Sequence, residues 1–423
     1  MNPNAEIHSA DFNKKPFWFS TINGIWRSTY GLGTKVKLDK DALIKSARKQ
    51  TSLHDLGTYF WDEPLDHLLY SINNEAQLHP IGRFITQKRL ENLLCVRLRA
   101  EEYFKKHPEI LEQELYSVTA VLGLQRTGTT KLQRLLASDP DTRALLSWEA
   151  LNPAPIKGDE FTGAERIKFA KMSENALKYM SPGFFAIHPV EHLAPEEDVL
   201  LLDVSFLSTT AEATMNVPGY AAWLEKTDQS PAYAYTVNLM KLLQWQRPAK
   251  KWVIKTPHHL EFLDLTVQHF GDVKFAWTHR DVQEAIPSFL SMVAYSRSLF
   301  SDAVIANDVA KHWVRKISFM LDKAMTFRNT GNNNELFVDV RFQDLIANSS
   351  EQLDRIYRHQ GLEISTDLKR IFNETETANP AQKYGKHKYQ LADFGIRKED
   401  INQQTGSYQE FYKILQKPHG EQQ

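Results

Sequence analysis

The first quarter of the chain has the hydrophobic spacing of helices. Between residues 38 and 115, apolar side chains recur every three or four positions, which is the period of one helix face. One such stripe consists of Leu90, Leu93, Leu94, Val96 and Leu98. A further helix should begin in "DKDALIKSARKQ", with Asp39 or Asp41 as its N-cap. We therefore expect residues 1–115 to form a mostly helical region that packs on the remainder of the chain.

The pattern changes from about Ser117 onward. Four short β-rich runs are each followed by a stretch of helical spacing: "SVTAVLGL", "KWVIKTP", "VKFAWTH" and "ELFVDVRF". These runs lack a strict polar–apolar alternation, which is typical of parallel strands buried on both faces. We predict an α/β domain over residues 116–423, with helices on both sides of a parallel sheet. In such folds, ligands bind at the carboxyl ends of the strands.

Composition narrows the class of protein. The 423 residues include 51 Lys and Arg against 52 Asp and Glu, a net charge of -1, which argues against a general nucleic-acid binder. The single cysteine, Cys95, rules out an internal disulfide and a cysteine-rich zinc site. The most apolar run, "VLLLDVSFL", is interrupted by Asp203, so no membrane span is expected. Since the N-terminus also lacks the pattern of a signal peptide, we expect a cytoplasmic enzyme.

An aromatic segment, "FWFSTINGIW", runs from Phe17 to Trp26. It could contact a membrane surface or pack on the protein's own domain. Packing on its own domain is the simpler interpretation.

The stretch "VLGLQRTGTTKLQRLLA" carries the strongest chemical signal. Four residues separate Gly123 and Gly128, as in the loops that bind nucleoside triphosphates, but Thr129 occupies the position of the usual lysine. We expect a strand over residues 117–122, a turn over 123–128 and a helix from Thr130. The apolar side chains of that helix, which should face the sheet, are Leu132, Leu135 and Leu136.

A strand, a glycine turn and a helix in this order direct free backbone N–H groups at one point, which favours an anion. Gly128 allows close approach, the hydroxyls of Thr127, Thr129 and Thr130 add donors, and Arg126 is the cation within the loop. The alternative is an ordinary tight turn capped by threonines. Without a loop lysine, the pattern favours a donor of lower charge than ATP and no metal ion.

The same residues resemble a known family. "LQRTGTTKLQRLLASDPDT" is similar to the 5′-phosphosulfate loop of sulfotransferases that use 3′-phosphoadenosine 5′-phosphosulfate (PAPS). Arg126 falls on the basic position of that loop, and Thr127, Gly128, Thr129 and Thr130 fall on its S/T-G-T-T run. The resemblance implies a P-loop-like fold and transfer of a sulfuryl group.

A second motif supports the resemblance. Members of this family bind the 3′-phosphate of the donor with an arginine at a strand end and a serine eight residues later. "VKFAWTHRDVQEAIPSFLSM" places Arg280 and Ser288 in this way, with Asp281 as a helix cap. Arg280 could instead form a surface ion pair. Kinases also contain H-R-D, but no glycine-rich lid accompanies it here, and the D-F-G at residues 393–395 lies far along the chain from Arg280.

Further stretches resemble the broad bacterial-type branch of the family: "SWEALNPAP", "HLAPEEDVLLLDVSF", "KTPHHLEFL", "VRFQDLIANS" and "HKYQLADFGI". The resemblance suggests Arg126 as the charge on the leaving oxygen and Glu149 as the general base. His258 is the second candidate base, His259 stands beside it, and Lys255 could reach the sulfate. Either histidine could instead cap a helix.

Two other segments could contribute to the site. "KYGKHKYQLADFG" resembles the basic loop that closes over the 3′-phosphate, with Lys383, Lys386 and His387 as candidates; a solvated charged turn is the alternative. In "HLAPEED", His192, Glu196 and Glu197 could line the acceptor site. The alternative is that this segment forms the acidic start of a helix.

The sequence thus predicts a metal-free, PAPS-dependent sulfotransferase. Its acceptor would be a hydroxyl or amine of a small molecule, a lipid or a carbohydrate. Two alternatives are a kinase-like P-loop enzyme and a nucleotide-binding protein without activity.

Overall fold

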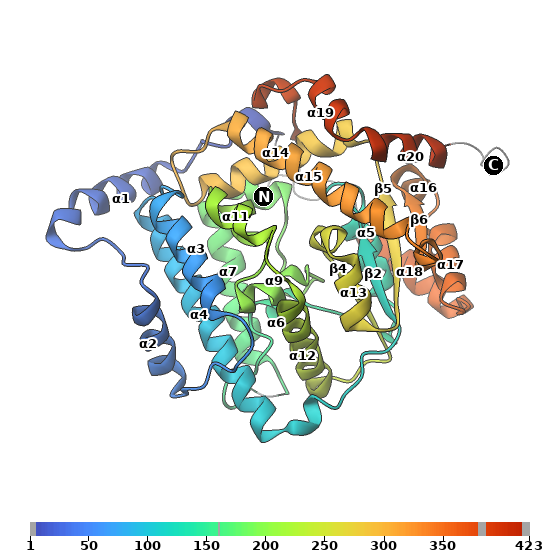
Figure 1. Ribbon diagram of the computed structural model, residues 1–423, viewed down its shortest axis with the longest axis horizontal. Coiled ribbons are helices and arrows are strands. Elements are labelled where there is room, and N and C mark those ends of the chain that lie inside the picture. Colours follow the sequence, from blue (N-terminus) through green and yellow to red (C-terminus); the bar gives the residue numbers. More distant parts are fainter. Residues whose placement is uncertain (1–5, 160, 380–385, 417–423) are drawn as a thin grey trace.

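The computed structural model describes residues 6–159, 161–379 and 386–416 and has a parallel five-stranded sheet at its centre (Figure 1). The strand order is β3-β4-β2-β5-β6, and every neighbouring pair is parallel. The strands are β2 (Val118–Leu122), β3 (Thr142–Ala144), β4 (Lys251–Lys255), β5 (Val273–His279) and β6 (Phe337–Arg341). The strand β2 is therefore central, and the segment that follows it emerges in the middle of the carboxyl edge.

Both faces of the sheet are buried, which confirms the predicted α/β fold. One face contributes Ala120, Leu122, Ile254, Phe275 and Trp277 to the main core. The other contributes Val121, Val253, Ala276, Val338 and Val340 to a second core. The four predicted runs coincide with β2, β4, β5 and β6. The edge strand β3 was not predicted, because three residues are too few to show a period.

Helices cover each face. The second core is closed by α5 (Thr129–Leu136), α16 (Phe342–Ala347), α17 (Ser349–His359) and α18 (Thr366–Ala378). The main core is closed by α12 (Ser230–Gln246), α13 (Leu263–Phe270), α14 (Val282–Ser298) and α15 (Ala306–Arg328). In Figure 1, α17 and α18 lie on one side of β2 and β5, and α12 and α13 lie on the other.

The N-terminal region is helical, as predicted. It contains α1 (Phe17–Ser28), α2 (Lys40–Thr51), α3 (Asp62–Asn74) and α4 (Pro80–Lys106). Asp39 caps α2, since its carboxylate accepts a hydrogen bond from the backbone N–H of Ala42 at 2.9 Å. Apolar residues of α2, α3 and α4 belong to the same core cluster as the sheet. A division between residues 115 and 116 stays a prediction.

Six further helices, five of them short, lie between β3 and β4. They are α6 (Ser147–Leu151), α7 (Ala164–Met180), α8 (Pro182–Ile187), α9 (Val199–Leu202), α10 (Thr210–Thr214) and α11 (Pro218–Leu224). In the part of the chain that the structure describes, no helix is both long and apolar enough to cross a membrane.

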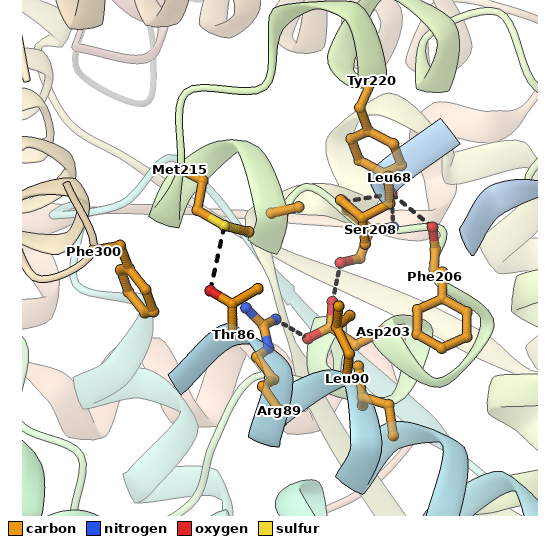
Figure 2. A pocket seen from close by; sticks show the side chains of 12 residues that line it. Leu68, Thr86, Arg89, Leu90, Asp203, Phe206, Ser208, Met215, Tyr220 and Phe300 are labelled. Atoms are coloured by element: carbon orange, nitrogen blue, oxygen red, sulfur yellow. Dashed lines mark hydrogen bonds and ion pairs between the residues drawn. The ribbon is translucent and has the colours of Figure 1, made fainter. Parts of the chain in front are cut away.

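A small cavity of about 20 Å³ lies where α4 meets the segment around α10 (Figure 2). Arg89 of α4 pairs with Asp203, and the Ser208 hydroxyl donates to the same carboxylate. The volume is that of about one water molecule, and the charges are paired with each other. The paired side chains around this cavity therefore link two elements of the core, and the cavity is too small for a substrate.

The two ends of the described chain meet in a separate small sheet. The strand β1 (Glu6–His8) pairs in parallel with β7 (Lys386–Lys388). The Tyr295 hydroxyl of α14 donates to the carbonyl oxygen of His8 at 2.9 Å. After β7 the chain forms α19 (Lys398–Gln404) and α20 (Gly406–Gln416). Neither strand of this sheet was predicted, since each has three residues.

Candidate active site

The loop between β2 and α5 has a backbone that requires its glycines. Gly123 has φ +139°, and a Cβ there would lie 2.3 Å from the Oγ1 of Thr278. Gly128 has φ +95° and begins α5 as its N-cap. Arg126 also adopts a left-handed φ of 71°, which is uncommon for a residue with a side chain. This shape turns the first backbone N–H groups of α5 toward the centre of the carboxyl edge of the sheet.

The threonines of the loop differ in their roles. The Thr127 hydroxyl donates to the carbonyl oxygen of Leu124 at 2.6 Å and meets the hydroxyl of Thr278 at 2.7 Å. It is buried and engaged within the protein, which corrects the expectation that all three hydroxyls face a ligand. Thr129 and Thr130, in the first turn of α5, line a cavity described below.

The Arg126 side chain links the two sequence motifs. Its Nε donates to the Oγ of Ser288 at 3.0 Å, and its Nη1 donates to the carbonyl oxygen of Ile187 at 3.2 Å. Burial, together with the nearby charge of Arg280, lowers the pKa of the Arg126 guanidinium. Among the described residues, no carboxylate forms an ion pair with Arg126. A partly buried cation without a counter-charge is a strong attractor for an anion.

Arg280 approaches the same point from β5. Its Nη1 donates to the carbonyl oxygen of Arg126 at 3.0 Å, and its guanidinium lies 4.5 Å from the ring centre of Phe342. The same guanidinium pairs with Glu284, one turn into α14, at 2.9 Å. Asp281 caps α14 by accepting from the backbone N–H of Gln283 at 2.9 Å, as predicted. The structure thus brings Arg126, Arg280 and Ser288 together.

Of the three candidates in the predicted basic loop, one has a described side chain. His387 of β7 lies 3.5 Å from the Ser288 hydroxyl and 2.8 Å from the Ser291 hydroxyl. Burial and the positive charge of Arg126 lower the pKa of His387 to about 4. Lys383 lies outside the described residues. Lys386 is part of β7, but its side chain is not described.

A cavity of about 270 Å³ opens beside the loop. Arg126, Thr129 and Thr130 form its donor end. The rest of the lining combines apolar side chains, Leu200, Phe289, Met292, Val293, Trp313 and Met320, with the hydroxyl-bearing Thr209, Thr210, Thr214 and Ser296. Of the residues predicted to line an acceptor site, Glu196 and Glu197 border this cavity. His192 does not: it borders another groove, and its Nδ1 lies 2.6 Å from the Glu174 carboxylate.

Glu149 does not reach this cavity, which corrects its predicted place in the site. It is buried, and its Oε1 pairs with Arg143 at 2.7 Å and with Arg247 at 3.3 Å. Its Oε2 accepts from the backbone N–H of Leu146 at 3.0 Å and so caps α6. This carboxylate is engaged by two arginines and a helix terminus, and removing it would leave Arg143 without its acidic partner.

His258 borders the cavity deeper in the fold. Its Nδ1 lies 3.3 Å from the Thr209 hydroxyl, and burial followed by the charges of His259 and Lys316 lowers its pKa well below the ordinary value. His259 points elsewhere: its Nε2 lies 2.7 Å from the Asp198 carboxylate. Both rings are therefore parts of the core rather than exposed helix caps.

Lys255 ends β4, next to the central strand. Its ammonium group pairs with Glu197 at 2.7 Å, and its backbone N–H donates to Asp198 at 2.9 Å. The lysine is thus paired with a glutamate that borders the cavity.

His188 is a site residue that the sequence did not reveal. It borders the cavity directly after Ile187, whose carbonyl oxygen accepts from Arg126. Burial lowers its pKa, the charges of Glu196 and Glu197 oppose that shift, and those of Lys255 and Arg126 add to it. The imidazole is thus neutral at neutral pH and stands among the charged groups of the site. Its segment, "FFAIHPV", matches no motif.

Comparison with known proteins decides the family. A sequence model of the sulfotransferase family matches residues 119–367, which is more than half of the chain. The chain belongs to the sulfotransferase family. Arg126, Arg280 and Ser288 all fall within the matched range, whereas β7 lies beyond it. No curated protein sequence matches this sulfotransferase significantly.

Solved structures resemble this sulfotransferase over most of its length. Sulfotransferase STF1 from Mycobacterium tuberculosis H37Rv is 28% identical, with a TM-score of 0.77, and the match covers 88% of this chain and 99% of that one. Sulfotransferase STF9 from Mycobacterium avium has a TM-score of 0.78 at 22% identity, covering 89% of this chain and 97% of that one. The second match concerns the fold alone. Both matches extend well beyond the range of the family model.

Proposed function

We propose that this sulfotransferase moves a sulfuryl group from PAPS to a hydroxyl on an acceptor with an apolar body. The observation that carries the proposal is the meeting of Arg126, Arg280 and Ser288. Arg126 is a cation without a carboxylate partner among the described residues, and it touches both residues of the second motif. The two sequence motifs that each favour an anion thus lie side by side. PAPS carries a phosphate on the 3′ side and another on the 5′ side of its ribose, so its binding requires two neighbouring anion sites.

The chain offers donors for each anionic part of PAPS. The backbone N–H groups at the start of α5 and the hydroxyls of Thr129 and Thr130 would hold the phosphosulfate. Arg280 and Ser288 would hold the 3′-phosphate, with His387 beside the serine. Glu284 would have to share Arg280 with that phosphate, because the two side chains are paired in the free protein.

The transfer needs a positive charge and a base. The acceptor oxygen forms a bond to sulfur while the bond between sulfur and the phosphate oxygen breaks, and the electron pair stays on that oxygen. Arg126 stabilises the growing charge on it as a fixed cation, because arginine keeps its proton at neutral pH. We propose His188 as the base that takes the acceptor proton. His188 is neutral in the free protein, and the negative charge of a bound donor would raise its basicity.

The cavity supports an apolar acceptor. Its wall includes aliphatic and aromatic side chains such as Phe289, Met292 and Trp313 beside the hydroxyls of the threonines and Ser296. A carbohydrate would place some of its many hydroxyls against the apolar side chains, at a cost for each one left without a partner. A small phenol or alcohol, or one end of a lipid, fits this wall better.

A kinase-like activity is the weaker alternative. The loop has threonine in place of the lysine that neutralises a triphosphate. Among the described residues, no group of three or more His, Cys, Asp or Glu side chains is arranged to hold a metal ion. Independence from metal and a cytoplasmic location stay predictions.

The donor site predicts a selective loss of affinity. We expect Arg280→Ala and Ser288→Ala each to weaken PAPS binding roughly 10- to 100-fold, because each removes a hydrogen bond to a charged phosphate oxygen. Adenosine 5′-phosphosulfate lacks the 3′-phosphate, so its affinity should change little. Isothermal titration calorimetry with both ligands measures the difference.

Glu284→Gln is the matched control, because it removes the carboxylate that competes for Arg280. We expect this variant to bind PAPS as tightly as the wild type or more tightly. Equal losses for both ligands in Arg280→Ala would mean that the arginine does not contact the 3′-phosphate, and the donor site would have to be reassigned.

A further inference from the structure

The helix α1 presents an apolar face to solvent. Phe17 is 87% exposed, Ile25 64% and Ile22 45%. In Figure 1, α1 lies at the margin of the molecule, away from the central sheet. Trp18 of the same helix is partly buried against the core, and its ring stacks on the exposed Tyr179 with 4.8 Å between ring centres. Exposed apolar side chains gathered on one helix of a folded chain often mark a contact with something else.

The opposite face of α1 shows that the helix is firmly docked. Phe19 is buried and packs edge-on against His79 at 5.2 Å. The buried side chain of Asn23 accepts a hydrogen bond from the backbone N–H of Ile81 at 3.0 Å. The expectation that the aromatic segment packs on its own domain is therefore correct for one face only. The exposed residues belong to a fixed surface.

The turn after α1 extends that surface. Leu32 stands between two glycines and is 83% exposed. The turn is held to the helix: the Nε1 of Trp26 donates to the carbonyl oxygen of Thr34 at 3.2 Å. The hydroxyls of Thr29 and Thr34 also meet at 2.7 Å. We call the exposed set Phe17, Ile22, Ile25 and Leu32 the α1 face.

The segment that carries the α1 face has basic residues and no acidic ones. The segment from Phe12 to Leu38 contains no Asp or Glu, and its cations are Lys14, Lys15, Arg27, Lys35 and Lys37. Asp302 pairs with Lys15 and Arg27, and Asp11 pairs with Lys14. Lys35 and Lys37 are exposed and form no ion pair with any described residue. An excess of positive charge therefore lies directly after Leu32.

Exposed apolar side chains next to unpaired lysines favour an anionic lipid surface over a second copy of the chain. In a two-fold pair of chains, the same face meets itself, so two sets of like charges would come together around the axis. An anionic lipid surface instead complements the lysines and accepts the apolar side chains. Helices that lie in the membrane interface have this division, with apolar residues on one side and Lys or Arg at the border.

We propose that the α1 face docks the sulfotransferase on an anionic phospholipid surface. Phe17, Ile22, Ile25 and Leu32 enter the interface between headgroups and chains, and Lys35 and Lys37 contact lipid phosphates. The inference concerns location on a surface and does not depend on the reaction or the donor.

The test is vesicle flotation of the full chain, with phosphatidylcholine vesicles and with an equal mixture of phosphatidylcholine and phosphatidylglycerol. The wild type should bind the mixed vesicles and bind the neutral ones at least tenfold more weakly. The triple variant Phe17→Ser, Ile25→Ser, Leu32→Ser should lose roughly tenfold or more of the binding. Lys35→Gln with Lys37→Gln should lose a similar factor while keeping every apolar side chain.

The matched control is Ile346→Ser with Ile414→Ser, which removes two exposed isoleucines far from α1 and should bind as the wild type does. The proposal is overturned if the wild type binds neither vesicle, or if control and triple variant behave alike. It is also overturned if light scattering shows a wild-type dimer that the triple variant converts to a monomer without vesicle binding. The face would then join two copies of the chain.

Discussion

Arg126→Ala should lower kcat by roughly 10²-fold or more, while the affinity for PAPS falls much less. The guanidinium touches Ser288 and lies beside the anion-binding start of α5. Negative charge on the oxygen that leaves sulfur grows only as the bond breaks, so the loss of a fixed cation affects the transition state most. Steady-state kinetics together with calorimetry of donor binding separates the two effects.

Two other variants make this result specific. Arg126→Lys keeps the charge but loses the forked geometry, so it should recover part of the rate. Arg134→Ala removes an arginine from the last turn of the same helix, where it pairs with Glu191 outside the cavity, and should leave kcat close to that of the wild type. If Arg126→Ala turns over as fast as Arg134→Ala, the assigned role of Arg126 is wrong.

His188→Gln should lower turnover by about 10²–10⁴-fold, which is the usual contribution of a general base. A base must be unprotonated, so activity falls as pH drops through its pKa. Burial holds the pKa of His188 below its ordinary value of 6.5 in the free enzyme. The acidic limb of kcat/KM for PAPS, which reports the free enzyme, should therefore lie below pH 6.5 and disappear in His188→Gln.

The other candidate bases provide the comparison. In His258→Gln the limb should persist, because that imidazole lies deeper in the cavity wall, against Thr209. Glu149→Gln should also keep the limb and instead lower the melting temperature, since it disrupts a buried ion pair with Arg143. If the limb persists in His188→Gln and vanishes in His258→Gln, the base is His258, the second candidate from the sequence.

Much of the donor end could be predicted from the sequence because it is encoded locally. A buried strand, two glycines and a helix fix the path of residues 118–136 without help from elsewhere. The position of Ser288 is also local, since two helical turns after β5 return it to the strand end. The contact of Arg126 with Ser288 follows once β2 and β5 are neighbours, as they are here.

The misplaced residues depend on contacts between distant segments. Spacing places Glu149 after the loop, but its direction is set by Arg143 in the unpredicted strand β3 and by Arg247 beyond α12. Thr127 turns inward because Thr278 of the neighbouring strand meets its hydroxyl. His188 enters the site because the carbonyl oxygen of Ile187 accepts from Arg126, and no local pattern records such a contact.

The central claim is transfer of a sulfuryl group from PAPS to an apolar hydroxyl compound. The most direct measurement incubates the protein with PAPS radiolabelled in the sulfuryl group, a panel of phenols, long-chain alcohols and sugars, and a metal chelator. We predict label on a phenol or alcohol, with one adenosine 3′,5′-bisphosphate formed for each labelled product and far less in Arg126→Ala. No labelled product from any acceptor, with phosphate transfer from ATP when Mg²⁺ is restored, would contradict the account.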